Sequence, residues 1–300
     1  MQMAGIILKQ TITMGLYMLM GFVLYRTGKL TKEGSRCIAT MLLWLILPVV
    51  IIRSFLKPFS MDNLAALGFS FLLGGIAYVV AMVLSWLVYR KDPLDCFSSA
   101  FSNVGFMGIP VVQSIYGPDG VALLSMFILM FNLFFFSYGV LLISGGLKLN
   151  LKVLLNACIF SALLGLLFGV TGWRLPGPVE NTLASIGSMN TPLAMMVIGA
   201  SVAHSDIRKA LTNMRMYRVC LLSMFLMPVL ILMVVRFLPI DPMLAGICVL
   251  LAAMPIAGNC GMVSDIYTPD DMTASHSVMV STLMSGLSLP LICTLISIAL

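Results

Sequence analysis

The sequence predicts an all-α polytopic membrane protein with ten transmembrane helices arranged as a 5+5 inverted repeat. Three observations predict this fold class. The composition is strongly apolar, ten uncharged stretches have membrane-spanning length, and prolines and glycines recur at matching places in the two halves of the chain. The halves are residues 1–147, with helices 1–5, and residues 148–300, with helices 6–10. Together they are expected to form a single integral membrane unit.

The composition excludes most soluble classes of protein. Of the 300 residues, 60% are hydrophobic and 9% are charged, whereas a soluble domain carries about 25% charged residues. So few charges cannot cover a water-exposed surface, which excludes a soluble enzyme, a disordered chain and a nucleic-acid-binding domain. The seven cysteines form no C-x-x-C pair, so buried, reduced thiols are expected, with no metal site and no cofactor.

The ten spans follow from the uncharged stretches. Each is about as long as a transmembrane helix, roughly 17–25 residues, and a lipid-facing backbone can satisfy its own hydrogen bonds only as a helix or a closed barrel. The stretches are too continuous for barrel strands. The first has no basic region ahead of it and no small-residue cleavage site, so it is interpreted as a retained helix. The stretches are 10–25, 37–52, 63–89, 96–118, 120–147, 153–173, 181–203, 219–235, 242–264 and 272–300.

The basic residues of the loops predict the orientation. The odd-numbered connections carry 12 Lys and Arg residues, and the opposite side of the membrane carries 5. Cytoplasmic loops are enriched in Lys and Arg. The odd connections are therefore expected in the cytoplasm of a cell-membrane protein, with both termini extracytoplasmic.

Proline spacing predicts the repeat. Pro48 and Pro192 are 144 residues apart, and Pro110 and Pro255 are 145 residues apart. Five spans lie on each side of the connection around residue 148, and because five is odd, the second half must enter the membrane from the opposite face. Inverted repeats of this kind are typical of secondary transporters.

Helices 4 and 9 are predicted to be broken. Each carries glycine, proline and one asparagine in the middle of an apolar span, and these residues weaken a helix. Interrupted segments at matching places in two halves indicate a transporter's binding site, where the N-terminal N–H groups of half-helices suit an anion. The alternative is that the glycines and prolines only kink or pack the helices and the asparagines hydrogen-bond between them. The predicted substrate-binding residues are Asn103, Gly105, Gly108, Pro110, Pro255, Gly258, Asn259 and Gly261.

These segments resemble the auxin efflux carrier family in its bacterial form. The resemblance rests on Asn-x-Gly-x-x-Gly-x-Pro at 103–110 and on the run from Ala253 to Tyr267, and it extends over the whole chain. It implies a fold similar to that of the bile-acid:sodium symporters, in which helices 4 and 9 cross at Pro110 and Pro255. It also implies elevator-like transport of organic anions, with helices 1, 2, 6 and 7 as the scaffold and a homodimer through that scaffold. The long cytoplasmic loop of the plant members is missing, so auxin gains no support as the substrate.

Few ionisable residues are candidates for coupling transport to an ion. Asp265, ten residues after Pro255, is the candidate for binding a driving H+ or Na+, although a hydrated position at the helix end would explain it equally well. Arg53 and Lys57 are expected to reach the membrane interface. The same holds for His204 and His276, while Asp270 and Asp271 are interpreted as loop residues.

The leading functional hypothesis is a secondary carrier of a small organic anion such as a dicarboxylate. A symporter of another carboxylate or of an amphipathic substrate, coupled to Na+ or H+, is the main alternative. The chain has no phosphate-binding G-x-x-x-x-G-K-[ST] loop and therefore no sign of ATP use. A channel and an intramembrane enzyme are more distant alternatives, because neither charge rings nor an H-E-x-x-H or G-x-S-x-G motif is present.

Overall fold

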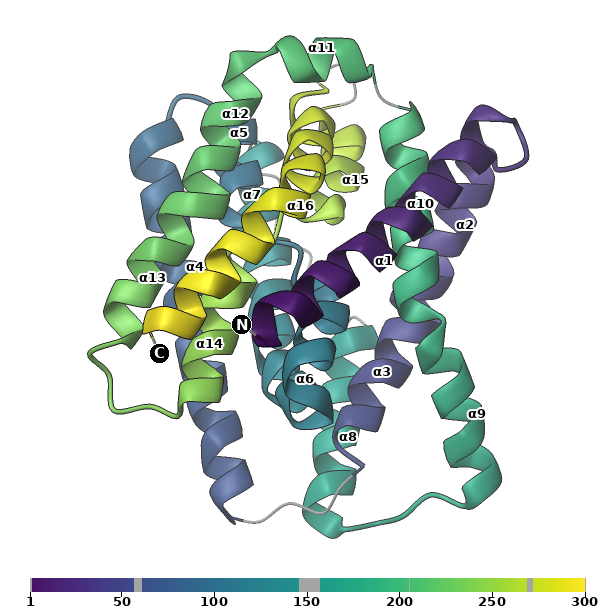
Figure 1. Cartoon of the computed structure of the whole chain (residues 1–300), viewed down its shortest axis with the longest axis vertical. Helices are drawn as coiled ribbons and strands as arrows, with labels where there is room; N and C mark the ends of the chain where they lie inside the picture. Colours follow the sequence, from purple (N-terminus) through teal and green to yellow (C-terminus); the bar gives the residue numbers. More distant parts are fainter. Residues whose placement is uncertain (1, 57–60, 146–156, 205, 269–271, 300) are drawn as a thin grey trace.

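The computed structural model describes residues 2–56, 61–145, 157–204, 206–268 and 272–299, and helices joined by short non-helical segments make up the described chain (Figure 1). The side chains of Asp265 and a few other residues inside the helices, and the predicted boundary at 147/148, lie outside the described part. The first half contains α1 (Gln2–Arg26), α2 (Lys32–Met41), η1 (Leu42–Ile46), α3 (Leu47–Ser54), α4 (Met61–Tyr89), α5 (Pro93–Ala100), η2 (Val104–Gly108), α6 (Ile109–Phe134), η3 (Phe135–Gly139) and α7 (Val140–Ile143). The second half contains α8 (Ala157–Thr171), α9 (Gly177–Ser188), α10 (Asn190–His204), α11 (Ile207–Thr212), α12 (Met214–Leu221), η5 (Leu222–Leu226), α13 (Met227–Val235), α14 (Pro242–Ala252), α15 (Gly258–Tyr267) and α16 (Thr273–Ala299).

Several of these helices can cross a membrane. Within the described residues, six continuous helical runs are long and apolar enough, and three further apolar helices are shorter. One of the six, Val104–Ile143, spans 40 residues and changes direction at Gly117, whose φ of 66° is a conformation that glycine adopts without strain. The chain is therefore a multi-pass membrane protein, and the count of ten spans stays a prediction. The long runs are Lys32–Ser54, Leu64–Tyr89, Val104–Ile143, Gly177–His204, Met214–Val235 and Thr273–Ala299.

Three prolines stand directly after a turn of π-helix. Pro48, Pro110 and Pro228 are each the second residue of an α-helix that follows η1, η2 or η5. Proline has no N–H to donate and its ring crowds the preceding turn, so a wider turn accommodates it without ending the helix. These prolines therefore lie inside continuous helical runs.

We distinguish two groups of packed helices, which touch one another through α1 and α16 and through α6 and α8. In the first, α1 lies along α10, α2 packs against α10, and α3 packs against α8 and α9 (Figure 1). In the second, α4 packs against α5 and α6, while α16 packs against α12 and α15. The helices α1 and α10 approach closely, because glycines on both let the backbones touch: a methyl group on Gly21 would overlap Met196, and one on Gly199 would overlap Met18.

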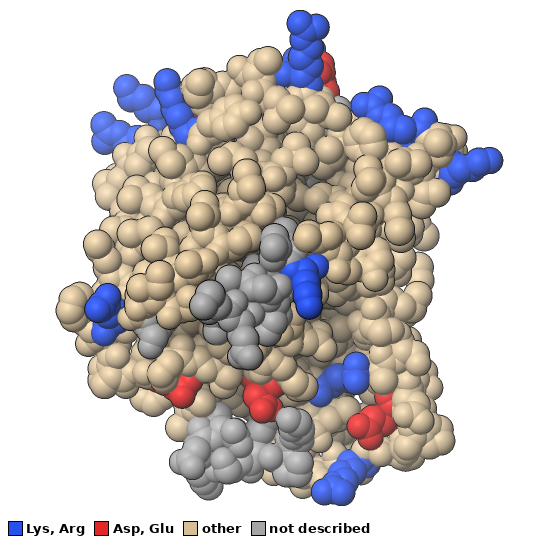
Figure 2. Space-filling model, in the orientation of Figure 1, with Lys and Arg blue, Asp and Glu red and all other residues tan. Residues whose placement is uncertain are grey.

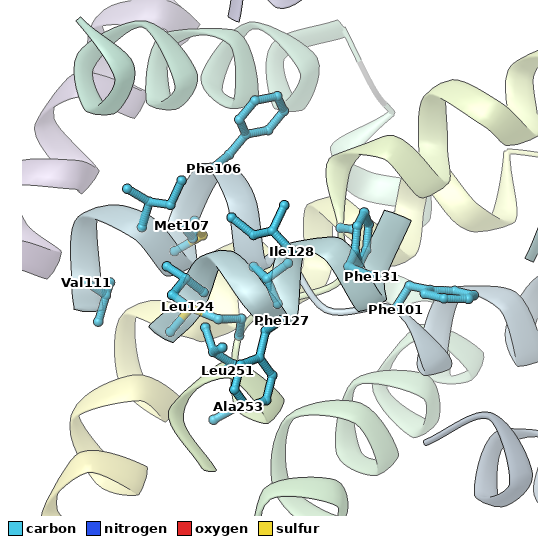
Figure 3. Close-up of a cluster of buried hydrophobic side chains, with 14 of the residues drawn as sticks. Phe101, Phe106, Met107, Val111, Leu124, Phe127, Ile128, Phe131, Leu251 and Ala253 are labelled. Atoms are coloured by element: carbon cyan, nitrogen blue, oxygen red, sulfur yellow. The ribbon is translucent and has the colours of Figure 1, made fainter. Parts of the chain in front are cut away.

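An aromatic cluster fills the core of the second group. Phe101 is fully buried, and its ring lies edge-on to Phe131 at 5.9 Å and to Phe135 at 5.1 Å between ring centroids. Phe127, Leu251 and neighbouring apolar side chains continue the cluster around α6 (Figure 3). This packing fixes the backbone at Phe101, where α5 ends.

Most charged side chains on the face shown in Figure 2 lie toward the two ends of the molecule, and a few Lys or Arg side chains lie at mid-height. Lys and Arg crowd the end that carries α11, while acidic and basic residues are mixed at the opposite end (Figure 2). At the basic end, the Asp206 carboxylate caps α11 by accepting a hydrogen bond from the Lys209 N–H at 3.1 Å, and this bond lowers the pKa of Asp206. The apolar belt between the two ends is where a bilayer would lie.

The cysteines match their prediction only in part. Cys96, Cys220, Cys248, Cys260 and Cys293 are buried free thiols, in line with the apolar runs that contain them. The thiol of Cys37 is instead exposed. Its helix α2 is amphipathic, and Cys37 lies on the outer face beside the exposed Arg36, so the prediction of burial was wrong for this residue.

Candidate functional site

Two interruptions of helical structure meet in the second group of helices. The first covers residues 101–103, between α5 and η2, and the second covers residues 253–257, between α14 and α15. Ser102 and Ile256 form an antiparallel β-bridge between them. Two chain segments more than 150 residues apart thus cross by direct backbone pairing.

Hydrogen bonds satisfy the backbone groups that the interruptions release. The Asn103 N–H donates to the Pro255 carbonyl at 2.7 Å, and the Ala257 N–H donates to the Phe101 carbonyl at 2.9 Å. The Ile256 N–H donates to the Ser281 hydroxyl of α16 at 3.1 Å. Unpaired amides are costly away from water, so these bonds allow a non-helical crossing inside an apolar protein. Ser281 was not predicted, because nothing in its local sequence links it to residue 256.

Asn103 is the last residue of the first interruption and caps the start of η2. Its side-chain carbonyl oxygen accepts a hydrogen bond from the Phe106 N–H at 3.1 Å, which caps η2, and the residue is 4% exposed. Asparagine is among the preferred residues for capping a helix start. Asn103 therefore stabilises the start of η2 as well as lining the crossing.

Asn259 has a different environment from Asn103. It lies in the first turn of α15, and its side-chain oxygen Oδ1 is buried without a hydrogen-bond donor among the described residues. Buried polar atoms nearly always have a partner in folded proteins. Both asparagines line one cavity of about 40 Å³, which extends to Leu43 and Leu47 on η1 and α3.

The start of α15 presents free backbone donors. Within the described part of the chain, the N–H groups of Gly258 and Asn259 have no acceptor. A side chain at Gly258 would meet no atom within 4 Å, so the backbone there is open. A second cavity, of about 80 Å³, reaches Gly258 and Gly261 and is bounded by α10 and α16. Free N–H groups at a helix start, with the positive end of the helix dipole, favour a bound anion.

The predicted glycines Gly105, Gly108 and Gly261 and the predicted coupling residue Asp265 have different environments. Gly108 and Gly261 allow close packing, because a Cβ would come within 3.0 Å of Leu251 and of the Ser275 hydroxyl respectively. Gly105, which belongs to η2, lines the 40 Å³ cavity. Asp265 belongs to α15, seven residues after Gly258, and its side chain is outside the described part.

The crossing contains one of the two expected prolines. Pro255 lies in it and accepts the hydrogen bond from Asn103. Pro110 does not: it is the second residue of α6, directly beyond η2, whose wider turn accommodates the proline inside a continuous helix. The resemblance implied that both prolines mark the crossing, and the structure places Ser102 and Asn103 there in the first half.

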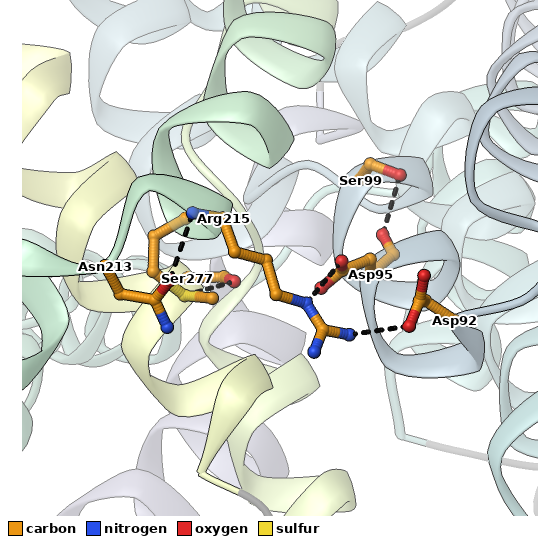
Figure 4. A network of polar contacts seen from close by, with 7 residues as sticks. Asp92, Asp95, Ser99, Asn213, Arg215 and Ser277 are labelled. Atoms are coloured by element: carbon orange, nitrogen blue, oxygen red, sulfur yellow. Dashed lines mark hydrogen bonds and ion pairs between the residues drawn. The ribbon is translucent and has the colours of Figure 1, made fainter.

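A buried ion pair near the crossing was missed in the sequence. The Arg215 Nε of α12 donates to Asp95 Oδ2 at 2.6 Å, and its Nη2 lies 3.2 Å from Asp92 Oδ1 (Figure 4). The Asp95 side chain is 3% exposed and belongs to α5, the helix that leads into the crossing. Two acidic residues around Pro93 resemble ordinary residues of a helix start, and no local signal links them to a residue 120 positions away.

The crossed backbone segments, with open amide donors inside a multi-pass helical membrane protein, define a protein of the membrane transport class. The comparison with known families agrees. The chain belongs to the membrane transport protein family, whose profile matches residues 6–146 and 144–293, and this confirms the resemblance to auxin efflux carriers. It is also 24% identical, over 91% of its length and 93% of the relative, to an uncharacterized transporter of Methanothermobacter thermautotrophicus. The family and the relative are both named for transport.

Proposed function

We propose that the protein is a secondary-active carrier of a small organic anion, such as a dicarboxylate. The observation that carries this proposal is the pair of free N–H groups at Gly258 and Asn259 beside the crossing. A carboxylate offers acceptor oxygens to such donors, and the dipole of α15 adds a favourable potential. The crossing segments are then the broken halves of helices 4 and 9, and the two halves of the chain are the inverted repeat.

The cavities support an elevator-like mechanism. Both lie where the crossing faces the first group of helices: the 40 Å³ cavity reaches η1 and α3, and the 80 Å³ cavity reaches α10. Ligand pockets usually have about 300–1,000 Å³, so substrate entry requires the two groups to move apart. We infer that α1–α3 and α8–α10 form the scaffold and that the second group carries the substrate across. A homodimer would form through that scaffold.

An amphipathic carboxylate is the second candidate substrate. A cavity of about 470 Å³ lies between α1, α10 and α16, and its walls are almost wholly apolar, with Met14, Met18, Phe22 and Met195 among them. Met107 of η2 and Thr282 of α16 join this cavity to the neighbourhood of the crossing. A substrate with a hydrophobic body would place its carboxylate at α15 and its body in this space.

The basic end of the molecule gives the proposed orientation. It carries the connections with most Lys and Arg residues and would face the cytoplasm, so that both termini are extracytoplasmic in the cell membrane. The membrane potential, the substrate gradient or a coupled H+ or Na+ would supply the driving force.

Replacing Asn259 with alanine tests the binding site. We expect kcat/KM for radiolabelled malate or malonate uptake into proteoliposomes to fall at least about tenfold, because the amide Nδ2 of Asn259 would donate to the carboxylate and a hydrogen bond to a charged group contributes about 1.5–3 kcal/mol. Asn103→Ala should also lower uptake, but it removes the cap of η2 as well. The matched control is Asn181→Ala on the exposed start of α9.

Full uptake by a folded Asn259→Ala protein would remove this residue from the site. Absence of saturable uptake of any carboxylate by the wild-type protein, including indole-type carboxylates, would refute the carrier hypothesis itself. Uptake that never saturates would indicate a channel.

Replacing Asp265 with asparagine tests ion coupling. Asp265 lies two turns along α15 from the free donors, about 10 Å at 1.5 Å per residue. If its carboxyl carries the coupled proton, Asp265→Asn should retain uptake down a substrate gradient and lose any acceleration by an inward proton gradient. The measurement compares uptake with and without that gradient, and with a sodium gradient in parallel. Proton-driven accumulation by the variant would exclude Asp265 as the coupling group.

A further inference from the structure

A large groove lies on the outer surface at the basic end of the molecule, away from the crossing. It has a volume of about 1000 Å³ and runs between the end of α4 and the helices α12, η5 and α13. The polar residues of its lining are Tyr89, Asp92, Asp95, Arg215 and Arg218, and the rest of the lining is apolar. A polar rim above an apolar wall matches the shape of a molecule with a charged head and a hydrocarbon tail.

The positive charge of the rim comes from Arg218 together with the two basic residues that follow α4. Arg215 is engaged with both Asp92 and Asp95, and the charge of Arg218 balances that of the second of these carboxylates, so the lining of the groove is itself neutral. Arg218 is exposed and has no ion-pair partner within the described residues. Arg90 and Lys91 follow Tyr89 directly and are also exposed. The rim therefore has a net positive charge that an anionic head group would complement.

The apolar wall has the length of an acyl chain. It continues from Arg218 along one helical face through Leu222, Phe225 and Val229. At 1.5 Å per residue, the eleven steps from Arg218 to Val229 extend about 16 Å into the hydrophobic belt. On the opposite wall, Val88 is 56% exposed and precedes Tyr89, a residue type that favours the membrane interface.

We propose that this groove binds an anionic glycerophospholipid of the cytoplasmic leaflet, with the phosphate at Arg218 and one acyl chain along η5 and α13. Basic pockets between transmembrane helices on the cytoplasmic side suit such head groups. Because Arg215 joins the groove to α5 through Asp95, the bound lipid lies beside the helix that enters the crossing. The proposal is independent of which substrate is carried.

Native mass spectrometry of the full-length protein tests the proposal. The purified protein is equilibrated with equal amounts of phosphatidylglycerol and phosphatidylethanolamine, and the wild type should retain phosphatidylglycerol preferentially. Arg218→Gln should reduce that preference about fivefold, since a basic residue near the membrane surface contributes about 1 kcal/mol toward an anionic lipid. The matched control is Arg208→Gln, which removes one exposed charge from α11 at the same end but outside the groove.

A second variant separates the acyl-chain site from the charge. Val229→Trp fills the lower groove without altering any charge and should lower retention of phosphatidylglycerol in a monodisperse protein. Equal retention of the two lipids by the wild type, or equal losses in Arg218→Gln and Arg208→Gln, would overturn the proposal. Displacement of the lipid by soluble glycerol phosphate would also overturn it, because the groove would then be a site for free anions.

Discussion

Alanine at Gly199 should lower the free energy of unfolding by about 3 kcal/mol, the upper part of the range for overpacked cores. Gly199 lies on α10 where that helix touches α1, and an added methyl group would overlap the carbonyl oxygen of Met18. The obstacle is backbone, so a side-chain rotation cannot relieve it and the two helices must separate. Small residues allow this close approach in membrane proteins, where packing rather than the hydrophobic effect joins helices.

Gly15→Ala is the matched control for Gly199→Ala. Gly15 lies on the same α1, and a methyl group there would meet no atom within 4 Å. Alanine favours a helix over glycine by about 1 kcal/mol, so this variant should be as stable as the wild type or more so. Thermal unfolding of the purified proteins in one detergent measures both. A Gly199→Ala protein that unfolds together with Gly15→Ala would contradict the tight α1–α10 contact.

The sequence predicts the class of this protein well and its local geometry less well. A chain with so few charges and such long uncharged runs belongs in a membrane for reasons of solvation alone, and the family comparison confirms a transporter. The apolar runs also locate most helices. The transport site and the inverted repeat remain predictions. Only transport measurements on variants can show which residues bind the substrate.

The geometry of the crossing depends on contacts that no local pattern contains. Proline and glycine indicate where a helix is weak, and they draw attention to Pro110. The helical structure is interrupted instead at Phe101–Asn103, because that stretch gains hydrogen bonds to Pro255 and Ala257 from the other half of the chain. Pro110 stays helical because a π-turn precedes it. Local helix propensity shows where a helix could be interrupted, and hydrogen bonds to distant segments determine which of those positions is interrupted.

The environments of the Asn103 and Asn259 side chains also could not be predicted from the local sequence. Both were predicted from their similar positions in two interrupted segments. In the structure, one carbonyl oxygen caps η2 and the other is buried without a donor in the described part of the protein. The difference arises because Asn103 precedes its helix and Asn259 lies inside the first turn of α15. A shift of two residues relative to a helix start therefore changes a capping acceptor into an acceptor without a donor in the described part, and of the Asn259 side chain only the amide Nδ2 could donate to an anion.

Arg215→Gln should destabilise the protein by about 3 kcal/mol, because it leaves the buried carboxylate of Asp95 without its cation. Removing one partner of a buried ion pair typically costs about 3–5 kcal/mol, and the lower end applies since the Arg215 side chain is 40% exposed. Asp95 lies on α5, directly before the crossing, so we also expect lower transport by the folded fraction.

Asp92→Asn is the matched control for Arg215→Gln, because it removes the other carboxylate of the same arginine. The Asp92 side chain is 51% exposed, and exposed pairs contribute about 0–1 kcal/mol. Thermal unfolding should therefore show a large loss for Arg215→Gln and almost none for Asp92→Asn. The double variant Asp95→Asn/Arg215→Gln removes both charges and should be less destabilised than the sum of its single variants. Additive losses would mean that Arg215 stabilises α12 by packing alone, and that α5 is held beside the crossing by its apolar neighbours instead of by this ion pair.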